Sequence, residues 1–261
     1  MLSVADEPHV ELQARNWRVV DLFEAFEIDE WRAEVARHGE LATRLRMPAY
    51  TWYTPLWAAV DAVHAGRWDE ALSLGARARE QGLRAGDRNA DLFADMLRFD
   101  EVIMRGMWET LNLELLLEKI SSSPAGMAWR AAYAWMLAAT AETDAAREQY
   151  AIVAADDFAA LPVDTNWPSA MGELASACLE LGDPGLARPL YDRLLPYAGR
   201  ALTAGRAITS FGSTQRLLGG LAAVLGRTDE AITRLEEAVR RNEAAGFTVW
   251  AEHARRQRDA L

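Results

Sequence analysis

The most regular pattern of apolar and polar positions lies in residues 218–246, LGGLAAVLGRTDEAITRLEEAVRRNEAAG. An apolar stretch ends at Gly226, and the stretch that follows repeats its apolar residues every three or four positions until Gly246. This spacing is the period of one helix face, and glycine favours the left-handed conformation that ends a helix. The segment therefore predicts two antiparallel helices joined by a tight turn, with Asp229 as N-cap of the second.

The same pattern recurs along the chain, with a small residue at each turn and an alanine five positions later in most copies. The repeated small residues let two helices approach closely, as in tetratricopeptide-like repeats. Strict repeats of that kind are about 34 residues long, whereas these turns are 40, 35, 41 and 44 residues apart, so the array is degenerate. The turn positions are Gly66, Gly106, Ala141, Gly182 and Gly226.

We therefore expect an all-α fold, a tetratricopeptide-like α-solenoid of about six antiparallel helical hairpins plus a C-terminal helix. No sustained alternation with a period of two indicates a β-strand anywhere in the chain. The expected organisation is a single helical-repeat domain over 1–261, which begins with a short lead-in at 1–10. Its parts are an irregular capping hairpin at 11–46, repeats at about 50–246 and a terminal helix at 247–261.

Composition narrows the classes of function. Hydrophobic residues make up 51% of the chain and the formal net charge is −11, which predicts a packed core and disfavours direct nucleic-acid binding. No apolar run is long enough to cross a membrane and no signal peptide is recognisable, so we expect a cytoplasmic protein. No cofactor motif is present. Cys178 is the only cysteine, and the histidines show no metal-ligand spacing, so no metal site is predicted; they are His9, His38, His64 and His253.

Four stretches, residues 48–72, 158–183, 188–200 and 213–246, carry a family resemblance. They resemble the C-terminal tetratricopeptide-like repeat region of actinobacterial ATP-dependent LuxR-type transcriptional regulators and nucleotide-cyclase-type signalling proteins. In those proteins separate ATPase, cyclase or DNA-binding domains carry the chemistry. Lys119 is the only lysine and does not follow a glycine, which excludes a Walker loop. The resemblance therefore implies the sensor or interaction region alone.

The resemblance also implies which side chains face the concave groove of the superhelix, because the first helix of each pair lines it. Of the positions it selects, only Asp100 and Arg216 are charged. The full set is Tyr53, Leu56, Val60, Val63, Phe93, Met96, Asp100, Ile103, Ala128, Ala131, Trp135, Ala138, Ser169, Gly172, Ser176, Leu179, Ser213, Arg216, Gly220 and Ala223.

Two alternatives follow from such a groove. Either an apolar ligand or a partner helix binds in it, or the superhelix is wound so tightly that the groove is buried. Aromatic residues bear on this choice, since the chain holds ten tryptophans. Tyr50, Trp52, Tyr53 and Trp57 are so close in sequence that one helix cannot point all of them inward. Some of them should then face the groove or a partner. The candidate groove residues are Tyr53, Trp57, Phe93, Met96, Asp100, Trp135 and Arg216.

The leading hypothesis is a non-catalytic binding and regulatory module that engages a partner protein, a peptide or an apolar small molecule in this groove. It assigns no catalytic residue. A second hypothesis is a stand-alone binding protein or enzyme of natural-product biosynthesis, with Asp100 as acid–base and Arg216 as anion partner. A third is a dimerisation scaffold, with exposed tryptophans at the interface of a homodimer.

Overall fold

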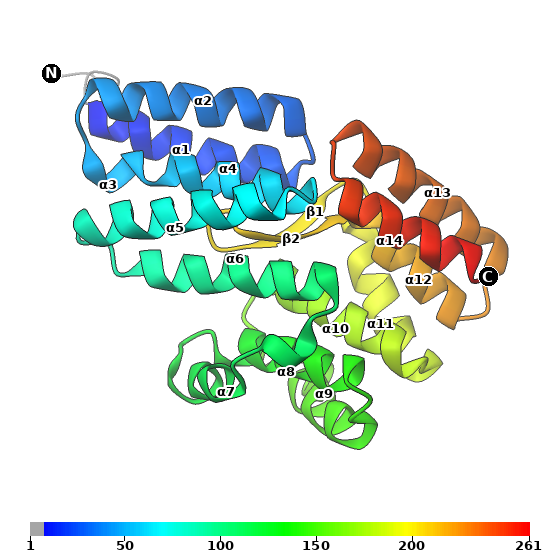
Figure 1. The fold of residues 1–261 in the computed structure, drawn as a ribbon. Coiled ribbons are helices and arrows are strands. Elements are labelled where there is room, and N and C mark those ends of the chain that lie inside the picture. The colour runs from blue at the N-terminus through cyan, green and yellow to red at the C-terminus, as the bar shows by residue number, and fades with distance from the viewer. Residues whose placement is uncertain (1–7) are drawn as a thin grey trace, which may run out of the picture.

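The structure, a computed structural model, describes residues 8–261 and is all-α apart from one small sheet (Figure 1). Helices that follow one another in the chain pack side by side in repeat-like succession, as the periodicity predicts. Of the expected lead-in, residues 8–10 belong to the first helix and the rest lies outside the described residues. The packed pairs are α1 (Pro8–Glu24) with α2 (Ile28–Arg44), α4 (Tyr53–His64) with α5 (Trp68–Arg84), α8 (Gly126–Ala139) with α9 (Thr143–Phe158), α10 (Trp167–Leu181) with α11 (Pro184–Leu194), and α12 (Gln215–Val224) with α13 (Thr228–Ala244).

All five predicted turn positions adopt the left-handed backbone conformation. The four glycines have φ between 60° and 74°, and Ala141 has φ 64° although it carries a side chain. The prediction of the turns is thus confirmed. The prediction of Asp229 as N-cap is wrong, because α13 begins at Thr228 with Arg227 as N-cap. The carboxylate lies in the first turn instead, where the partial positive charge of the helix N-terminus stabilises it.

The third pair is the loosest. Helix α6 (Asn89–Arg105) is followed by a 3-10 turn, η2 (Trp108–Thr110), and then by α7 (Leu113–Ser122). The side chain of Asn112 caps α7 by accepting a hydrogen bond from the Leu115 amide at 3.0 Å. Because α7 packs mainly on α8, a cleft remains between α6 and α7. Two shorter helices complete the fold, α3 (Pro48–Thr51) and η3 (Leu195–Tyr197).

An antiparallel β-hairpin occupies the interior of the helical array, where the sequence predicted no strand. Strand β1 (Ala201–Ala204) pairs with β2 (Thr209–Ser213), and every residue of both strands is buried. Helices α1, α6, α10, α12, α13 and α14 all contact the strands, which lie at the centre of the molecule (Figure 1). A strand that is covered on both faces has no polar side, so it shows no alternation in its sequence. That is why the expectation of an array without strands is wrong here.

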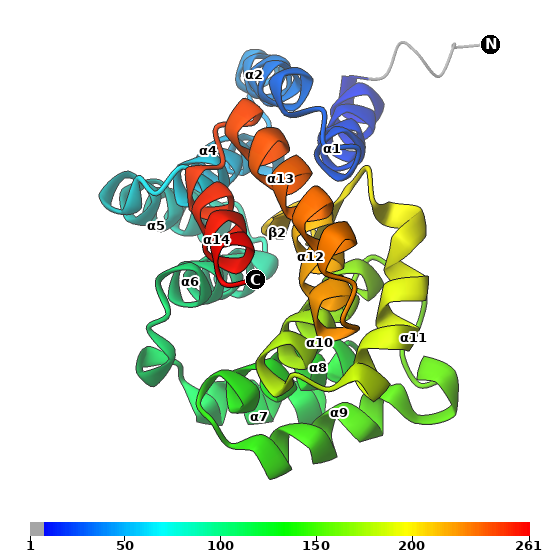
Figure 2. The ribbon, with the colours of Figure 1, turned by 90° about the vertical axis from the view of Figure 1, so that its right-hand side faces the viewer.

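The chain closes on itself at its C-terminal end. Helix α14 (Thr248–Asp259) forms where a terminal helix is predicted, yet Trp250, Ala251 and Ala254 on one face are buried. Figure 2 shows α13 and α14 lying against the N-terminal helices. Three contacts join the two ends: Arg32 Nη2 to the Ala245 carbonyl at 2.7 Å, Thr248 Oγ1 to the Ala65 carbonyl at 3.0 Å, and Trp250 Nε1 to His64 Nδ1 at 3.2 Å. A fourth contact, His253 Nε2 to the Met104 carbonyl at 3.2 Å, joins α14 to α6.

Within residues 8–261, no helix has the length and apolar character needed to cross a membrane. The same residues bring together no group of three or more histidine, cysteine, aspartate or glutamate side chains that could hold a metal ion.

Candidate functional site

The seven candidate groove residues all face the interior of the array, and all are buried, with exposed fractions of at most 8%. Five of them, Trp57, Phe93, Met96, Asp100 and Trp135, contact the β-hairpin. Trp57 Nε1 donates a hydrogen bond to the Arg206 carbonyl at the hairpin turn, at 2.8 Å. Trp135 packs against Phe211 of β2, with ring centroids 5.7 Å apart. The concave face is therefore covered by a segment of the same chain.

Further contacts hold the hairpin in place. Phe93 and Met96 of α6 lie against Gly205 at the tip of the hairpin, and the Phe211 ring covers Gly172, where any side chain would collide with it. At the other end, Asn242 Oδ1 accepts a hydrogen bond from the Ser213 amide at 3.0 Å.

The aromatic cluster at the start of α4 is also buried. The chain breaks between α3 and α4 at Trp52, so these side chains do not project from one regular helix. Trp52, Tyr53 and Trp57 all point inward, and Tyr53 stacks on Trp57 with ring centroids 5.2 Å apart. Only Tyr50 is partly exposed. The premise that all four aromatic side chains lie on one helix is wrong: α3 and α4 share them, so three are buried although a single helix could not point all four inward.

The Asp100 carboxyl group is hydrogen-bonded to the β-hairpin. Its Oδ2 accepts a hydrogen bond from the Ser210 amide at 3.2 Å, and burial raises the pKa of Asp100 well above its usual value of 3.8. Glu173 of α10 is a neighbouring acid whose pKa burial also raises, with a further contribution from Asp100. Asp100 does not line the cavity that Arg216 faces, so the structure does not bring the two together as an acid–base and its anion partner.

Arg216, at the start of α12, is in a different situation. Its side chain is only 4% exposed, and its guanidinium lies over the Trp250 ring with the central carbon 4.6 Å from the ring centroid. Nε and Nη2 are buried and have no hydrogen-bond partner within the described chain. These two nitrogens form one edge of the guanidinium, the edge that binds a carboxylate through two parallel hydrogen bonds.

Arg216 faces a cavity of about 250 Å³, which we call the Arg216 pocket. Its walls come from the end of α6, from η2, and from α8, α10, α12 and α14. Two other polar atoms at this cavity, Ser176 Oγ and Gln257 Oε1, are also buried without a hydrogen-bond partner in residues 8–261. Trp108 and Trp135 meet edge to face in its wall, with ring centroids 5.3 Å apart.

The charges around the pocket leave Arg216 unpaired. Burial lowers the pKa of Arg216 to about 10, and Glu180 opposes this shift from a distance. Burial raises the pKa of Glu180, and the positive charge of Arg216 lowers it in part. The described residues nevertheless show no ion pair between these two side chains. Burial, reinforced by Arg216, lowers the pKa of His253 to about 4, so this ring is neutral at pH 7. The arginine remains charged because even a pKa near 10 is far above neutral pH.

The other cations at the pocket already have partners. Arg105 pairs with Glu101 at 2.7 Å, and Arg256 pairs with Glu252 at 3.1 Å. Arg216 is thus the wall residue whose charge is buried and has no ion-pair partner in residues 8–261, its one charge-compensating contact there being the Trp250 ring.

The sequence register found part of this site and missed the rest. It selected Ile103, Trp135, Ser176, Leu179 and Arg216, all of which line the pocket. Trp250, His253 and Gln257 were missed, because they come from α14, which reaches the site only through the closure of the array. Glu180 and Trp108 were also missed, since they lie outside the positions that the register selects.

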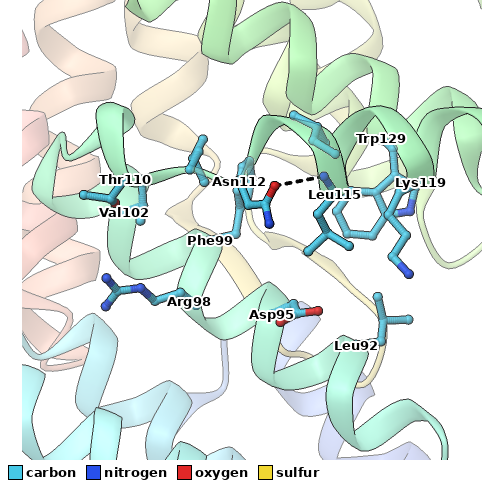
Figure 3. A pocket seen from close by; sticks show the side chains of 12 residues that line it. Leu92, Asp95, Arg98, Phe99, Val102, Thr110, Asn112, Leu115, Lys119 and Trp129 are labelled. Carbon is cyan, nitrogen blue, oxygen red and sulfur yellow. Dashed lines mark hydrogen bonds between the residues drawn. The ribbon is translucent and has the colours of Figure 1, made fainter.

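A second opening is the cleft between α6, α7 and α8 (Figure 3), with a volume of about 230 Å³. Phe99 and Leu115 point into it from opposite sides, and Trp129 closes one end. Its polar residues are largely engaged within the chain: Arg98 pairs with Glu101 at 2.6 Å, and Asn112 caps α7. Asp95 and Lys119 lie at its rim. The cleft is apolar and offers few groups that could orient a ligand.

No protein-family model matches this chain, and comparison with curated proteins and with solved structures gives no significant match.

Proposed function

We propose that this protein is a non-catalytic binding and regulatory module that holds a small effector with an anionic group in the Arg216 pocket. The observation that carries the proposal is that Arg216 lines a cavity and that two buried donors on one edge of its guanidinium have no partner in residues 8–261. Leaving buried donors unpaired costs about 1–3 kcal/mol for each group, and more for charged groups. A ligand anion that accepts from both nitrogens removes this cost.

The position of the pocket suits a regulatory role. Its wall combines the end of α6, which belongs to the third helical pair, with α14 at the C-terminal end of the array, and His253 Nε2 lies 3.2 Å from the Met104 carbonyl between them. A ligand in the pocket contacts both α6 and α14 and so stabilises their packing relative to any arrangement in which they separate. The resemblance to repeat regions of transcriptional regulators implies that an associated regulator would respond to this change.

The pocket supports this function better than the other two candidate surfaces. The concave face is occupied by the β-hairpin, and the α6–α7 cleft has polar groups that are already bonded within the chain. The Arg216 pocket has three polar side chains with buried atoms that lack a partner in residues 8–261, those of Arg216, Ser176 and Gln257.

The test is a thermal-shift and calorimetric titration with simple carboxylates such as 4-methylpentanoate and benzoate. We expect them to raise the melting temperature of the wild type and to leave Arg216→Met unchanged. Arg216→Lys should bind more than tenfold more weakly than the wild type, because lysine lacks the two-nitrogen edge. Arg240→Met serves as the matched control, since this arginine is 70% exposed and pairs with Glu237.

The proposal is contradicted if carboxylates bind Arg216→Met as well as they bind the wild type. Circular dichroism of each variant verifies that loss of binding does not come from loss of the fold.

A further inference from the structure

The Arg216 pocket presents acceptors as well as donors. Gln257 Oε1 is a buried acceptor without a donor in residues 8–261, and the Glu180 carboxylate stands at the exposed rim of the same cavity. A simple carboxylate would satisfy Arg216 but would leave the buried Gln257 oxygen without a donor and the Glu180 carboxylate without a cation. It would also bring a second negative charge close to Glu180.

The helices place these groups around one space. Ser176 and Glu180 are four residues apart on α10, so they lie on the same helix face, one turn apart. Gln257 comes from α14 and Arg216 from α12. Donors and acceptors therefore converge on the cavity from three helices, and the two opposite charges share the cavity without an ion pair between them.

The pairing of the other charges confirms that Glu180 is available. The two further arginines of the wall, Arg105 and Arg256, are bound to Glu101 and Glu252. The mutual influence of Arg216 and Glu180 on their pKa values shows that each lies within the electrostatic field of the other. A molecule with one negative and one positive group compensates both charges at once.

We propose, resting on the proposed function, that the ligand of this pocket is a small zwitterion of the α-amino-acid class. Its carboxylate accepts hydrogen bonds from Nε and Nη2 of Arg216 and from the Ser176 hydroxyl. Its ammonium group donates to Gln257 Oε1 and lies beside the Glu180 carboxylate. The cavity of about 250 Å³ limits the ligand to roughly the size of a single amino acid, and the rings of Trp108 and Trp135 contact its side chain.

The test compares ligands that share a side chain and differ only in charge. Thermal-shift assays on the wild type screen each standard amino acid beside the acid that lacks its amino group and the amine that lacks its carboxylate. For leucine these are 4-methylpentanoate and 3-methylbutylamine. The best set is then measured by calorimetry. We expect the amino acid to bind at least tenfold more tightly than the matched acid, and the amine to bind more weakly than both.

Two variants assign the ammonium subsite. Glu180→Gln and Gln257→Leu should reduce the affinity for the amino acid to that for the matched acid, and should leave the affinity for the acid unchanged or higher. Glu236→Gln is the control for charge alone, because this residue is exposed on α13 and lines none of the cavities described above. It should bind both ligands as the wild type does.

The outcomes separate the two proposals. If carboxylates bind through Arg216 but no amino acid binds more tightly than its matched acid, the zwitterion inference is overturned and the proposed function stands. If neither amino acids nor carboxylates bind, both are overturned. Tight binding of the amino acid that Glu180→Gln and Gln257→Leu leave unchanged also overturns the assignment of the ammonium subsite.

Discussion

The interior around the β-hairpin and the Arg216 pocket deal with buried charge in opposite ways. Asp100 and Arg216 are the two charged residues among the positions that the repeat register selects, and both are at most 6% exposed. Asp100 accepts a hydrogen bond from the backbone of the hairpin, whereas Arg216 lines an open cavity and the Nε–Nη2 edge of its guanidinium has no hydrogen-bond partner in residues 8–261. The β-hairpin fills the interior around Asp100, whereas no segment of residues 8–261 fills the Arg216 pocket. Burial alone therefore does not separate structural from ligand-binding residues, but the presence or absence of a partner does.

The largest change in the free energy of unfolding is expected when a side chain that packs against the hairpin is removed. Trp57 is fully buried and bonded to the hairpin turn, so Trp57→Ala leaves a large cavity and an unpaired carbonyl. We expect the free energy of unfolding to fall by about 3–5 kcal/mol, measured by urea denaturation. Leu72→Ala, at a side chain that is 63% exposed, should change it by less than about 0.5 kcal/mol. A small effect of Trp57→Ala would mean that the hairpin is not part of the core.

The next effect concerns the hydrogen bond of Asp100. Asp100→Ala leaves the buried Ser210 amide without an acceptor, and should destabilise the protein by about 1–3 kcal/mol at pH 4. Asp100→Asn retains an acceptor and should be close to the wild type at that pH. Equal stability of Asp100→Ala and Asp100→Asn would show that the hydrogen bond contributes nothing.

Asp100 should also make the stability depend on pH. Its pKa is higher in the folded protein than the ordinary value of 3.8, so the folded state binds more protons than the unfolded state in the range between them. The contribution of Asp100 is fully present below pH 3.8 and is lost as pH rises through the folded pKa. Relative to Asp100→Asn, the wild type should lose up to about 1.4 kcal/mol per pH unit in that range. Denaturation curves from pH 4 upward measure the difference, and parallel curves would contradict it.

A smaller effect, of opposite sign, is expected at Arg216. Arg216→Met removes a buried charge with two unpaired donors and retains an apolar side chain over Trp250. Because the lost cation–π contact partly offsets the gain, we expect the ligand-free protein to become more stable by about 1 kcal/mol. Chemical denaturation without ligand measures this, with Arg240→Met as the neutral control. A loss of stability at Arg216→Met would show that the arginine supports the fold.

The smallest effects compare two hydroxyl groups. Thr203 Oγ1 in the hairpin donates to the Thr209 carbonyl at 2.6 Å, so Thr203→Val should cost about 1 kcal/mol. Ser176 Oγ has no partner in residues 8–261, so Ser176→Ala should change the stability by less than about 0.5 kcal/mol while it weakens carboxylate binding. If Ser176→Ala costs as much as Thr203→Val, the hydroxyl has a structural role.

Much of the local structure follows from the sequence, because helices and their turns depend on neighbouring residues. The glycines at positions 66, 106, 182 and 226 mark the turns by their conformational freedom, and the three-to-four-residue period marks the helix faces. The same register placed Trp135, Ser176 and Arg216 on faces that meet at the pocket. What it selected was the interior side of each helix, which holds core and candidate site alike.

Only the tertiary structure decided which inward-facing residues are covered by another segment of the chain and which line a cavity. Residues 201–213 carry no alternation, since both faces of each strand are covered, so neither the hairpin nor its place could be predicted from the pattern. Gln257 and Trp250 enter the pocket because α14 packs on α4 and α6, long-range contacts that no local period encodes. The sequence thus determined the helices and their inward faces through short-range periodicity. Long-range packing determined that Asp100 meets the hairpin and that Arg216 faces an open cavity.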